Sequence, residues 1–402
     1  MTTRGMPHVD FEQAPFLVIW ETTQACELAC QHCRASAQPN RDDRELTTDE
    51  AKDLITAVAE MGTPVFILSG GDPLKRPDLC ELISWGKQAG LRMGTIPAAT
   101  PTLNRDHIER LKDAGLDQMA MSLDFPRADL HDDFRCAPGA FRKTMQALEW
   151  AHDVQMPVQI NTSVFAGSAA YLPEMAELVK TLDIVFWEVF FLVPVGRGEN
   201  VDGLSAQRCE ELFDVLYRAQ KEGPFIVKVT EAPHYRRFVA QRELAESDTP
   251  PLRPGHTASM PRQLLRSEGP GHTVGLAARG VNAGKGFAFV SHLGEVFPSG
   301  FLPCSAGNVR TNGIQHIYRE SPLFLALRDP DRLVGRCGRC EFRSICGGSR
   351  SRAFAMTNDY FATDPWCAYE PVAAAPIDQD KDEPDTQSAV TSSAPSTSTR
   401  VP

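Results

Sequence analysis

The chain has 402 residues, of which 42% are hydrophobic and 23% are charged, a balance typical of a folded protein and unlike collagen or a disordered chain. Its formal net charge is −11 without a basic stripe, which argues against a nucleic-acid scaffold. The longest apolar run, residues 184–195, is 12 residues and contains Glu188, whereas a membrane span needs about 20. Because the N-terminus also lacks an apolar signal core, we expect a cytoplasmic protein.

Between residues 16 and 191, short apolar runs alternate with longer mixed-charge runs. We predict strands at 16–21, 64–69, 91–96, 118–123, 157–164 and 184–191. We predict helices near 47–61, 77–89, 104–114, 139–153 and 170–181. Repeated strand–helix units of the α/β class form a parallel sheet, either doubly wound or curled into a barrel. In both cases functional residues gather at the carboxyl ends of the strands.

Downstream, a helix at 205–221 and a strand at 225–229 are followed by less regular sequence. Residues 245–280 are rich in Pro, Gly, Ser and Arg, which predicts a long loop. Residues 371–402 contain no aromatic residue, which predicts disorder. We therefore expect five parts: an N-terminal arm (1–15), a barrel domain (16–230), a linker with a flexible insertion (231–285), a small cysteine-rich domain (286–370) and an acidic tail (371–402).

Three of the eleven cysteines crowd together directly after the first predicted strand. Cys26, Cys30 and Cys33, the first cysteine group, have the spacing CxxxCxxC. Three thiolates on one loop can hold three irons of a [4Fe–4S] cluster and leave the fourth iron open to another ligand. Two alternatives are three unrelated buried thiols and a zinc site completed by His32, which we keep among the cofactor-binding candidates.

Four further cysteines crowd near the C-terminus. Cys337, Cys340, Cys346 and Cys367, the second cysteine group, can ligate every iron of another [4Fe–4S] cluster or complete a structural zinc site. Disulfides are rare in a reducing compartment, so metal or redox chemistry is the better interpretation of both groups.

With its cysteine loop, the segment from about residue 16 to 195 resembles the radical SAM superfamily. The resemblance implies a partial (βα)6 TIM-like barrel. It also implies that S-adenosylmethionine binds the open iron and is cleaved reductively to a 5′-deoxyadenosyl radical, which abstracts hydrogen from a substrate. The electron would come from a low-potential donor such as flavodoxin or ferredoxin.

Several candidate cofactor contacts follow the predicted strands. Gly70, Gly71 and Asp72 resemble the superfamily's GGEP motif, which implies that this backbone binds the methionine amino group. The stretch containing Ser122, Asp124 and Arg135 resembles an SLD…HDxxR pattern, which implies contacts to the ribose and the methionine carboxylate. Asn161 and Arg197 are two further cofactor candidates; their alternatives are a satisfied buried amide and an ordinary loop arginine.

The second cysteine group resembles a SPASM or twitch domain, which carries auxiliary clusters. Arg350 stands where the full SPASM pattern has another cysteine, so we expect one auxiliary [4Fe–4S] cluster rather than two. Cys304 lies near the place of that domain's first cysteine but lacks partners, and behaves as a small hydrophobic residue.

Residues 16–37, 192–198 and 346–353 look like one branch of the superfamily, the proteins of haem d1 and alternative haem biosynthesis. This implies a tetrapyrrole with carboxylic side chains as substrate, for which Arg197, Arg350 and Arg352 are candidate partners. The alternatives are a maturase that modifies a ribosomal peptide or protein, and a non-enzymatic iron–sulfur or zinc module. No residue is identified as a catalytic acid or base.

Overall fold

The computed structural model describes residues 9–246 and 280–372. The predicted loop at 245–280 and the predicted tail therefore lie almost wholly outside the described residues, as does half of the N-terminal arm. Within the described ranges, nine strands form one sheet in the order β7-β6-β5-β4-β3-β2-β1-β8-β9. The first seven are β1 (Leu17–Glu21), β2 (Val65–Ser69), β3 (Arg92–Thr95), β4 (Gln118–Ser122), β5 (Val158–Val164), β6 (Phe186–Phe191) and β7 (Ile226–Thr230).

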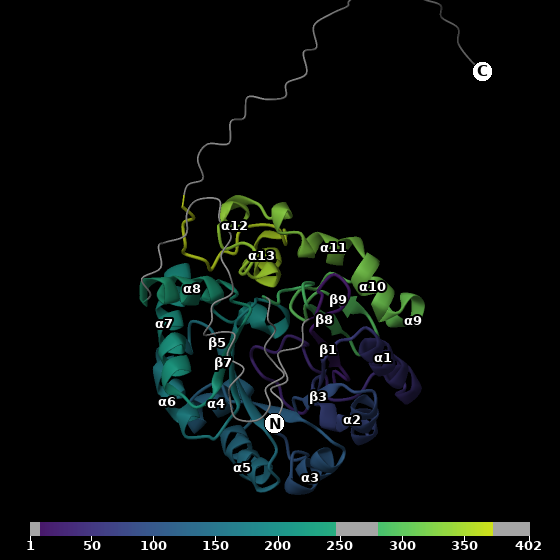
Figure 1. Cartoon of the computed structure of the whole chain (residues 1–402). Coiled ribbons are helices and arrows are strands. Elements are labelled where there is room, and N and C mark those ends of the chain that lie inside the picture. The colour runs from purple at the N-terminus through teal and green to yellow at the C-terminus, as the bar shows by residue number, and fades with distance from the viewer. Residues whose placement is uncertain (1–8, 247–279, 373–402) are drawn as a thin grey trace, which may run out of the picture.

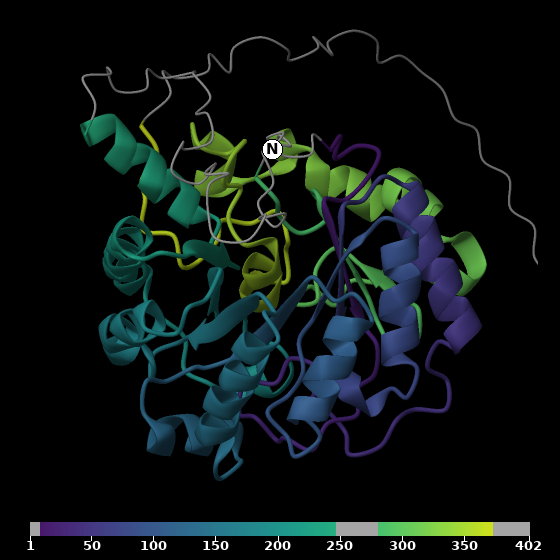
Figure 2. The ribbon, with the colours of Figure 1, turned by 60° about the horizontal axis from the view of Figure 1, so that its bottom comes forward.

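Helices alternate with these parallel strands and cover the outer face of the curled sheet (Figures 1 and 2). They are α1 (Thr48–Glu60), α2 (Leu79–Gln88), α3 (Arg105–Asp113), α4 (Ala128–Arg135), α5 (Ala140–Asp153), α6 (Leu172–Lys180) and α7 (Ala206–Glu222). Their apolar sides bury residues such as Leu54 and Leu212 against the strands. A reciprocal capping box between Thr47 and Glu50 begins α1.

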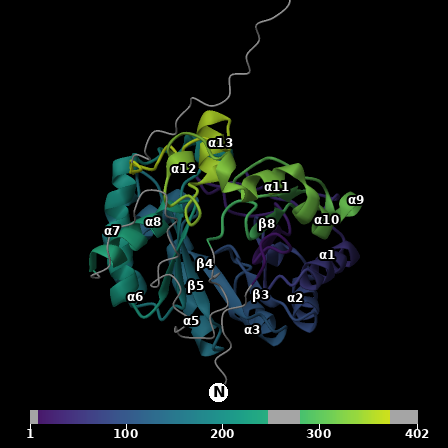
Figure 3. The ribbon, with the colours of Figure 1, turned by 45° about the horizontal axis from the view of Figure 1, so that its top comes forward.

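The predicted fold class is confirmed. Every strand and helix predicted between residues 16 and 229 is present, with ends displaced by at most two residues. The short α4 and the helix α8 (His234–Glu246) were not predicted, and α8 occupies part of the segment expected as a linker. In the tilted view of Figure 3, helices α6, α5, α3, α2 and α1 follow a curve outside the strands. The result is a half-barrel whose concave face surrounds a lumen.

The C-terminal region continues the barrel sheet. β8 (Phe287–Val290) pairs parallel with β1, and β9 (Val296–Phe297) pairs antiparallel with β8. The remaining helices are α9 (Val309–Asn312), α10 (Ile314–Glu320), α11 (Pro322–Arg328), α12 (Gly335–Arg339) and α13 (Arg350–Thr357). In Figure 1, α12 and α13 lie above the half-barrel, so this region covers one end of the lumen.

Buried aromatic residues fill the space between the sheet and its helices, including Trp20, Phe66 and Trp187. Phe11, upstream of β1, is also buried, and its carbonyl accepts a 2.8 Å hydrogen bond from the Tyr318 hydroxyl. No helix among the described residues is long and apolar enough to cross a membrane.

Candidate functional site

The first cysteine group lies on the loop that leaves the carboxyl end of β1. The turn after β2 holds this loop, since Gly71 N donates to Thr23 O and Asp72 N donates to Ala25 O, each at 2.7 Å. A Cβ placed on Gly71 would lie 2.5 Å from Ala25 O, and one on Gly70 would lie 2.6 Å from Thr23 O. Only glycine allows this approach, so the Gly-Gly pair seats the cysteine loop through its backbone.

Each thiol of this group accepts one hydrogen bond. Leu28 N donates to Cys26 Sγ at 3.3 Å, and Ala37 N donates to Cys33 Sγ at 3.5 Å. The Arg135 guanidinium donates to Cys30 Sγ at 3.7 Å. Burial raises the pKa of Cys26 to about 11, and the nearby Cys30 and Cys33 add to the rise. Bound iron would remove this penalty by taking the thiolate charge, so the donor set suits a cluster.

Arg135 and Asp124 form a buried pair beside the cysteine loop. Asp124 Oδ2 accepts from Arg135 Nε at 2.7 Å and from Nη2 at 2.5 Å. Burial alone would raise the pKa of Asp124, but Arg135 and the nearby His32 and His131 lower it to about 2. Asp124 therefore stays ionised and fixes Arg135 next to Cys30.

Arg197 holds the cysteine loop from the other side. Its Nε donates to Cys30 O at 2.9 Å and its backbone N donates to Cys33 O at 3.1 Å, while its Nη2 is buried without a partner. His32 stacks on Phe134 at 4.4 Å between ring centroids, and its Nδ1 is likewise buried without a partner. Both nitrogens are therefore available to a ligand bound near the loop.

Two other predicted residues, Asp72 and Asn161, have side-chain hydrogen bonds within the protein. The Asp72 carboxylate accepts from Leu74 N and from Thr100 Oγ1, both at 3.1 Å, so its side chain ties two loops together. Asn161 Oδ1 accepts from Gln159 Nε2 at 2.7 Å on the lumenal face of β5. Ser122 ends β4, in register with Asn161 on β5.

All four cysteines of the second group line one small cavity. Cys346 Sγ accepts from Gly348 N at 3.4 Å, and Cys337 Sγ lies 3.6 Å from Arg350 Nη2, which donates to it. Backbone groups of Phe342 and Tyr369 donate to Cys340 and Cys367. Burial raises the pKa of Cys340 to about 12 and that of Cys346 further, with contributions from the neighbouring thiols.

Among the described residues, no three Cys, His, Asp or Glu side chains converge as the ligands of one metal ion. The thiolates that hold a [4Fe–4S] cube sit at its corners, farther apart than the four ligands of one Zn²⁺, so this finding leaves a cluster in either group open.

Arg350 and Arg352 are structural, contrary to the suggestion that they meet substrate carboxylates. Arg350 donates to the carbonyls of Tyr360 and Ala362, each at 2.8 Å. Arg352 is wholly buried, pairs with Asp364 at 3.1 Å and lies over the Trp366 ring. Neither side chain lines the lumenal cavity.

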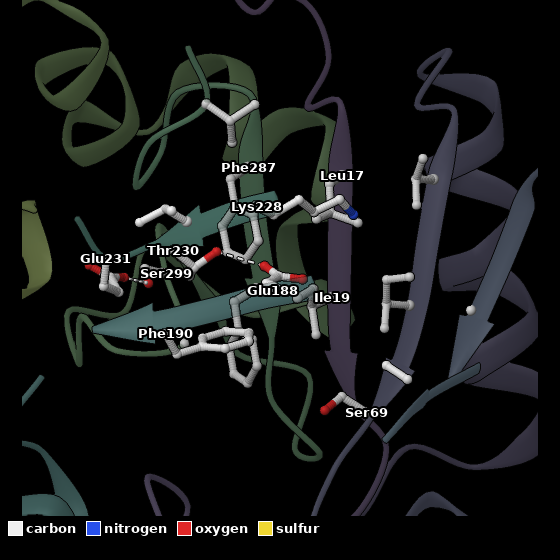
Figure 4. Close-up of a pocket in the computed structure, with 18 of the residues that line it drawn as sticks. Leu17, Ile19, Ser69, Glu188, Phe190, Lys228, Thr230, Glu231, Phe287 and Ser299 are labelled. Atoms are coloured by element: carbon white, nitrogen blue, oxygen red, sulfur yellow. Dashed lines mark hydrogen bonds between the residues drawn. The ribbon is translucent and has the colours of Figure 1, made fainter. Parts of the chain in front are cut away.

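The lumen contains a cavity of about 360 Å³ with two unlike walls (Figure 4). One wall is apolar and comes from β1, β2 and β8, with Leu17, Ile19, Ile67, Phe287 and Phe289. The other wall, which we call the polar wall, comes from β3 to β7 and adds polar side chains, those of Arg92, Gln118, Gln159, Glu188 and Lys228, to apolar ones such as Ala120, Phe190 and Val229. An amphiphilic ligand matches this division.

The polar wall is a connected row. Gln118 Nε2 donates to Gln159 Oε1 at 2.9 Å, and Gln159 Nε2 donates to Glu188 Oε2 at 2.6 Å. Thr230 Oγ1 donates to Glu188 Oε1 at 2.6 Å, as Figure 4 shows. Glu188 thus meets side chains of neighbouring strands. Sequence reasoning missed this row, although polar residues at alternate positions of apolar strands were its signal.

Near the mouth of the lumen, Arg34 joins the cysteine loop to the cavity. Arg34 Nη2 pairs with the buried Glu21 at 2.5 Å, and its guanidinium lies 4.5 Å from the Phe289 ring centroid. His292 Nδ1 lies 2.9 Å from the other Glu21 oxygen. The cavity therefore begins where the first cysteine group is held.

Comparison with known proteins agrees with this geometry. A model of the radical SAM superfamily matches residues 20–181. An AdoMet-dependent heme synthase from Methanosarcina barkeri is 40% identical, over 89% of this chain and 97% of that protein. Another from Oleidesulfovibrio alaskensis is 36% identical, over 88% of this chain and 87% of that protein. SuiB from Streptococcus suis, solved bound to S-adenosylmethionine, shares the fold with a TM-score of 0.66 at 14% identity, over 89% of this chain and 78% of SuiB.

The half-barrel with a cysteine loop after β1 is that of a radical SAM enzyme. Enzymes of this superfamily use a [4Fe–4S] cluster and S-adenosylmethionine, which the donor sets described above suit. Within the superfamily, the chain belongs to the family of the two heme synthases. The alternative of a non-enzymatic iron–sulfur or zinc module is therefore wrong.

Proposed function

We propose that this enzyme acts on a carboxylic side chain of a tetrapyrrole. The observation that carries the proposal is the two-sided cavity below the cysteine loop: its apolar wall suits a flat macrocycle, and its polar wall contains cations that suit carboxylates. The names of the two heme synthases support the same substrate class.

The first cysteine group would hold the catalytic cluster, with Gly70, Gly71 and Asp72 shaping the adjoining turn. Bound there, the cluster and S-adenosylmethionine supply a 5′-deoxyadenosyl radical that abstracts hydrogen from the substrate. We assign Ser122, Asp124, Arg135, Asn161 and Arg197 to orienting the cofactor, since Arg135 and Arg197 contact the cysteine loop and Ser122 is in register with Asn161. The unpartnered Arg197 Nη2 is suited to its carboxylate, whereas Arg135 is already held by Asp124 and Cys30.

The chain's own residues set the geometry of the reaction. Arg135 and Arg197 fix the cysteine loop through side-chain and backbone bonds, which keeps the radical source in one place above the cavity. The apolar wall keeps water away from the reacting carbon. The second cysteine group would hold one auxiliary [4Fe–4S] cluster. The electron donor would be a low-potential flavodoxin or ferredoxin, and we place the enzyme in the cytoplasm.

An anaerobic turnover tests the substrate. Reconstituted, reduced enzyme is mixed with S-adenosylmethionine and a panel of carboxylated tetrapyrroles, and both 5′-deoxyadenosine and the mass of each tetrapyrrole are followed. We expect one tetrapyrrole to change mass in step with 5′-deoxyadenosine. Cleavage of S-adenosylmethionine with every tetrapyrrole unchanged would overturn the proposal in favour of a peptide or protein maturase.

A further inference from the structure

The first turn of α8 separates the lumenal cavity from the second cysteine group. His234 and Arg237 of this turn line the small cavity that the four cysteines also line. Tyr235 and Arg236, which alternate with them along the chain, line the cavity of the lumen. The two cavities are therefore divided by the thickness of one helical turn.

Two side chains of the lumenal cavity bind the segment that contains Cys346. Arg236 Nη1 donates to Ile345 O at 3.0 Å. Asn282 Nδ2 donates to Cys346 O at 3.2 Å and to Gly348 O at 2.9 Å. Both side chains are only partly buried, and both line the lumenal cavity. A ligand in this cavity can therefore touch residues that hold the backbone on either side of a cysteine of the second group.

The Arg236 guanidinium has no carboxylate partner. Both of its acceptors are backbone carbonyls, those of Ile345 and Val281. Across residues 9–246 and 280–372, no carboxylate oxygen lies within 4.0 Å of its nitrogens. Burial lowers the pKa of Arg236 to about 10, and the nearby Cys346 opposes this shift. An anionic cluster on one side and a ligand carboxylate on the other would both offset the cost of burying this cation.

The other charged side chains of the cavity have different surroundings. Glu231 accepts hydrogen bonds from the hydroxyls of Ser299, Ser349 and Ser351, the first of which Figure 4 shows. Arg34 is paired with a buried carboxylate beside the first cysteine group. Arg92 and Lys228 belong to strands of the polar wall. Arg236 differs from these three cations because it is bonded to the backbone next to Cys346.

We infer that Arg236 couples the two sites: its charge raises the reduction potential of the second cluster, and a substrate carboxylate bound near it in the lumen lowers that potential again. The inference rests on the proposed tetrapyrrole substrate and on the proposed auxiliary cluster, and it makes that cluster respond to filling of the cavity. A nearby cation stabilises the more negative, reduced form of a cluster, so neutralising the cation makes reduction harder. Asn282 is a positioning residue that holds the same segment without a charge.

The first test is a redox titration of the reconstituted full-length enzyme, followed by electron paramagnetic resonance. The signal that Cys30→Ala retains identifies the second cluster. R236Q keeps a donor for the Ile345 carbonyl but loses the charge, and its potential should fall by about 59 mV, a ten-fold change in the one-electron equilibrium. R236K should keep most of the wild-type potential. R242M, which removes an exposed cation farther along α8 that pairs with Asp214, should keep all of it.

The second test repeats the titration with a metal-free porphyrin that has four carboxylates and with its uncharged tetra-amide. Fluorescence confirms that each porphyrin is bound at saturation. The tetra-acid should lower the wild-type potential more than the tetra-amide does. In R236Q this difference should shrink by about half or more, because the cation that the carboxylate neutralises is gone.

A wild-type potential in R236Q, with its iron still bound, would overturn the inference and leave the tetrapyrrole substrate intact. An undiminished effect of the tetra-acid in R236Q would overturn the coupling in the same way. Failure of the wild type to bind either porphyrin would instead reject the substrate class, while the titration without ligand still tests the charge of Arg236. Iron analysis and thermal unfolding check each variant, and R236M replaces R236Q if the latter loses the second cluster. Loss of that cluster from R236K as well would make Arg236 purely structural and overturn the inference.

Discussion

The first and second cysteine groups differ in how the chain surrounds them. The first lies on a single loop, fixed by glycine turns and by two arginines, and it opens toward a lumen. The second is assembled from α12, the turns after it and the segment near residue 367, and its four cysteines line one small cavity. Three thiolates leave one iron of a cluster free for an exchangeable ligand, whereas four do not, so we call the first group the open site and the second group the closed site.

The largest expected effect comes from removing one ligand of the open site. Cys30→Ala should abolish reductive cleavage of S-adenosylmethionine, because it removes one of three thiolates and with it the sulfur that accepts from Arg135. Iron analysis should still find the cluster of the second group. Retained production of 5′-deoxyadenosine by this variant would contradict the assignment of the first site.

The matching change in the closed site should remove iron without removing the first cluster. Cys340→Ala is expected to lose about half of the bound iron and to stop turnover of substrate, since four-thiolate ligation is broken. Cleavage of S-adenosylmethionine should persist, which separates the two sites. Loss of zinc in place of iron would make the second site a structural metal centre.

The next effect, smaller than the two losses of activity, concerns the stability of the region around the second cysteine group. Arg352→Met should lower the free energy of unfolding by about 3–5 kcal/mol, because it leaves Asp364 buried without its cation. Denaturant unfolding measures this change, and the exposed Arg105→Met is the control, with an effect below about 1 kcal/mol.

The Arg352–Asp364 pair should also make the free energy of unfolding depend on pH. Burial alone would raise the pKa of Asp364, but Arg352 and His234 lower it below its ordinary value. The contribution of the ionised group is therefore present above the ordinary pKa of about 4 and is lost as the pH falls through the lower, folded-state pKa. The difference in stability between the wild type and Arg352→Met should shrink in acid, and a constant difference down to pH 3 would contradict this account.

Much of the open site could be predicted from the sequence because its chemistry is local. The cysteine spacing, the Gly-Gly turn and the strand preceding them lie within one strand–helix–strand unit, where periodicity and turn residues are informative. The pairing of β8 with β1 could not be predicted in this way, since it joins residues about 270 apart through a four-residue strand. Its energy comes from tertiary packing rather than from local preference.

What each arginine binds could not be predicted from local sequence either. Sequence position placed Arg350 and Arg352 near the second cysteine group, but only the fold shows that backbone carbonyls and Asp364 use their donors. Lys228 and Arg92, conversely, sit in short strands with no motif around them, and they gain significance only because the curl of the sheet brings β3 and β7 to one lumen.

The smallest expected effect tests how tightly the open loop is seated. Gly71 does not adopt a positive φ, so Gly71→Ala acts through space alone: its Cβ would meet Ala25 O at 2.5 Å and Gln24 O at 2.6 Å. Since both atoms are backbone, the loop must move, at a cost of about 1–3 kcal/mol. We expect S-adenosylmethionine to bind about 10- to 100-fold more weakly, as measured by equilibrium binding to the reconstituted enzyme.

Gly62→Ala is the control for this change, because a Cβ there meets no atom within 4 Å and its positive φ costs only local stability. It should bind S-adenosylmethionine as the wild type does. Equal affinity for S-adenosylmethionine in Gly71→Ala and Gly62→Ala would mean that the cysteine loop tolerates displacement. The first and second cysteine groups would then differ only in their number of thiolates. A selective loss in Gly71→Ala would instead show that the backbone cradle, and not only the three cysteines, defines the open site.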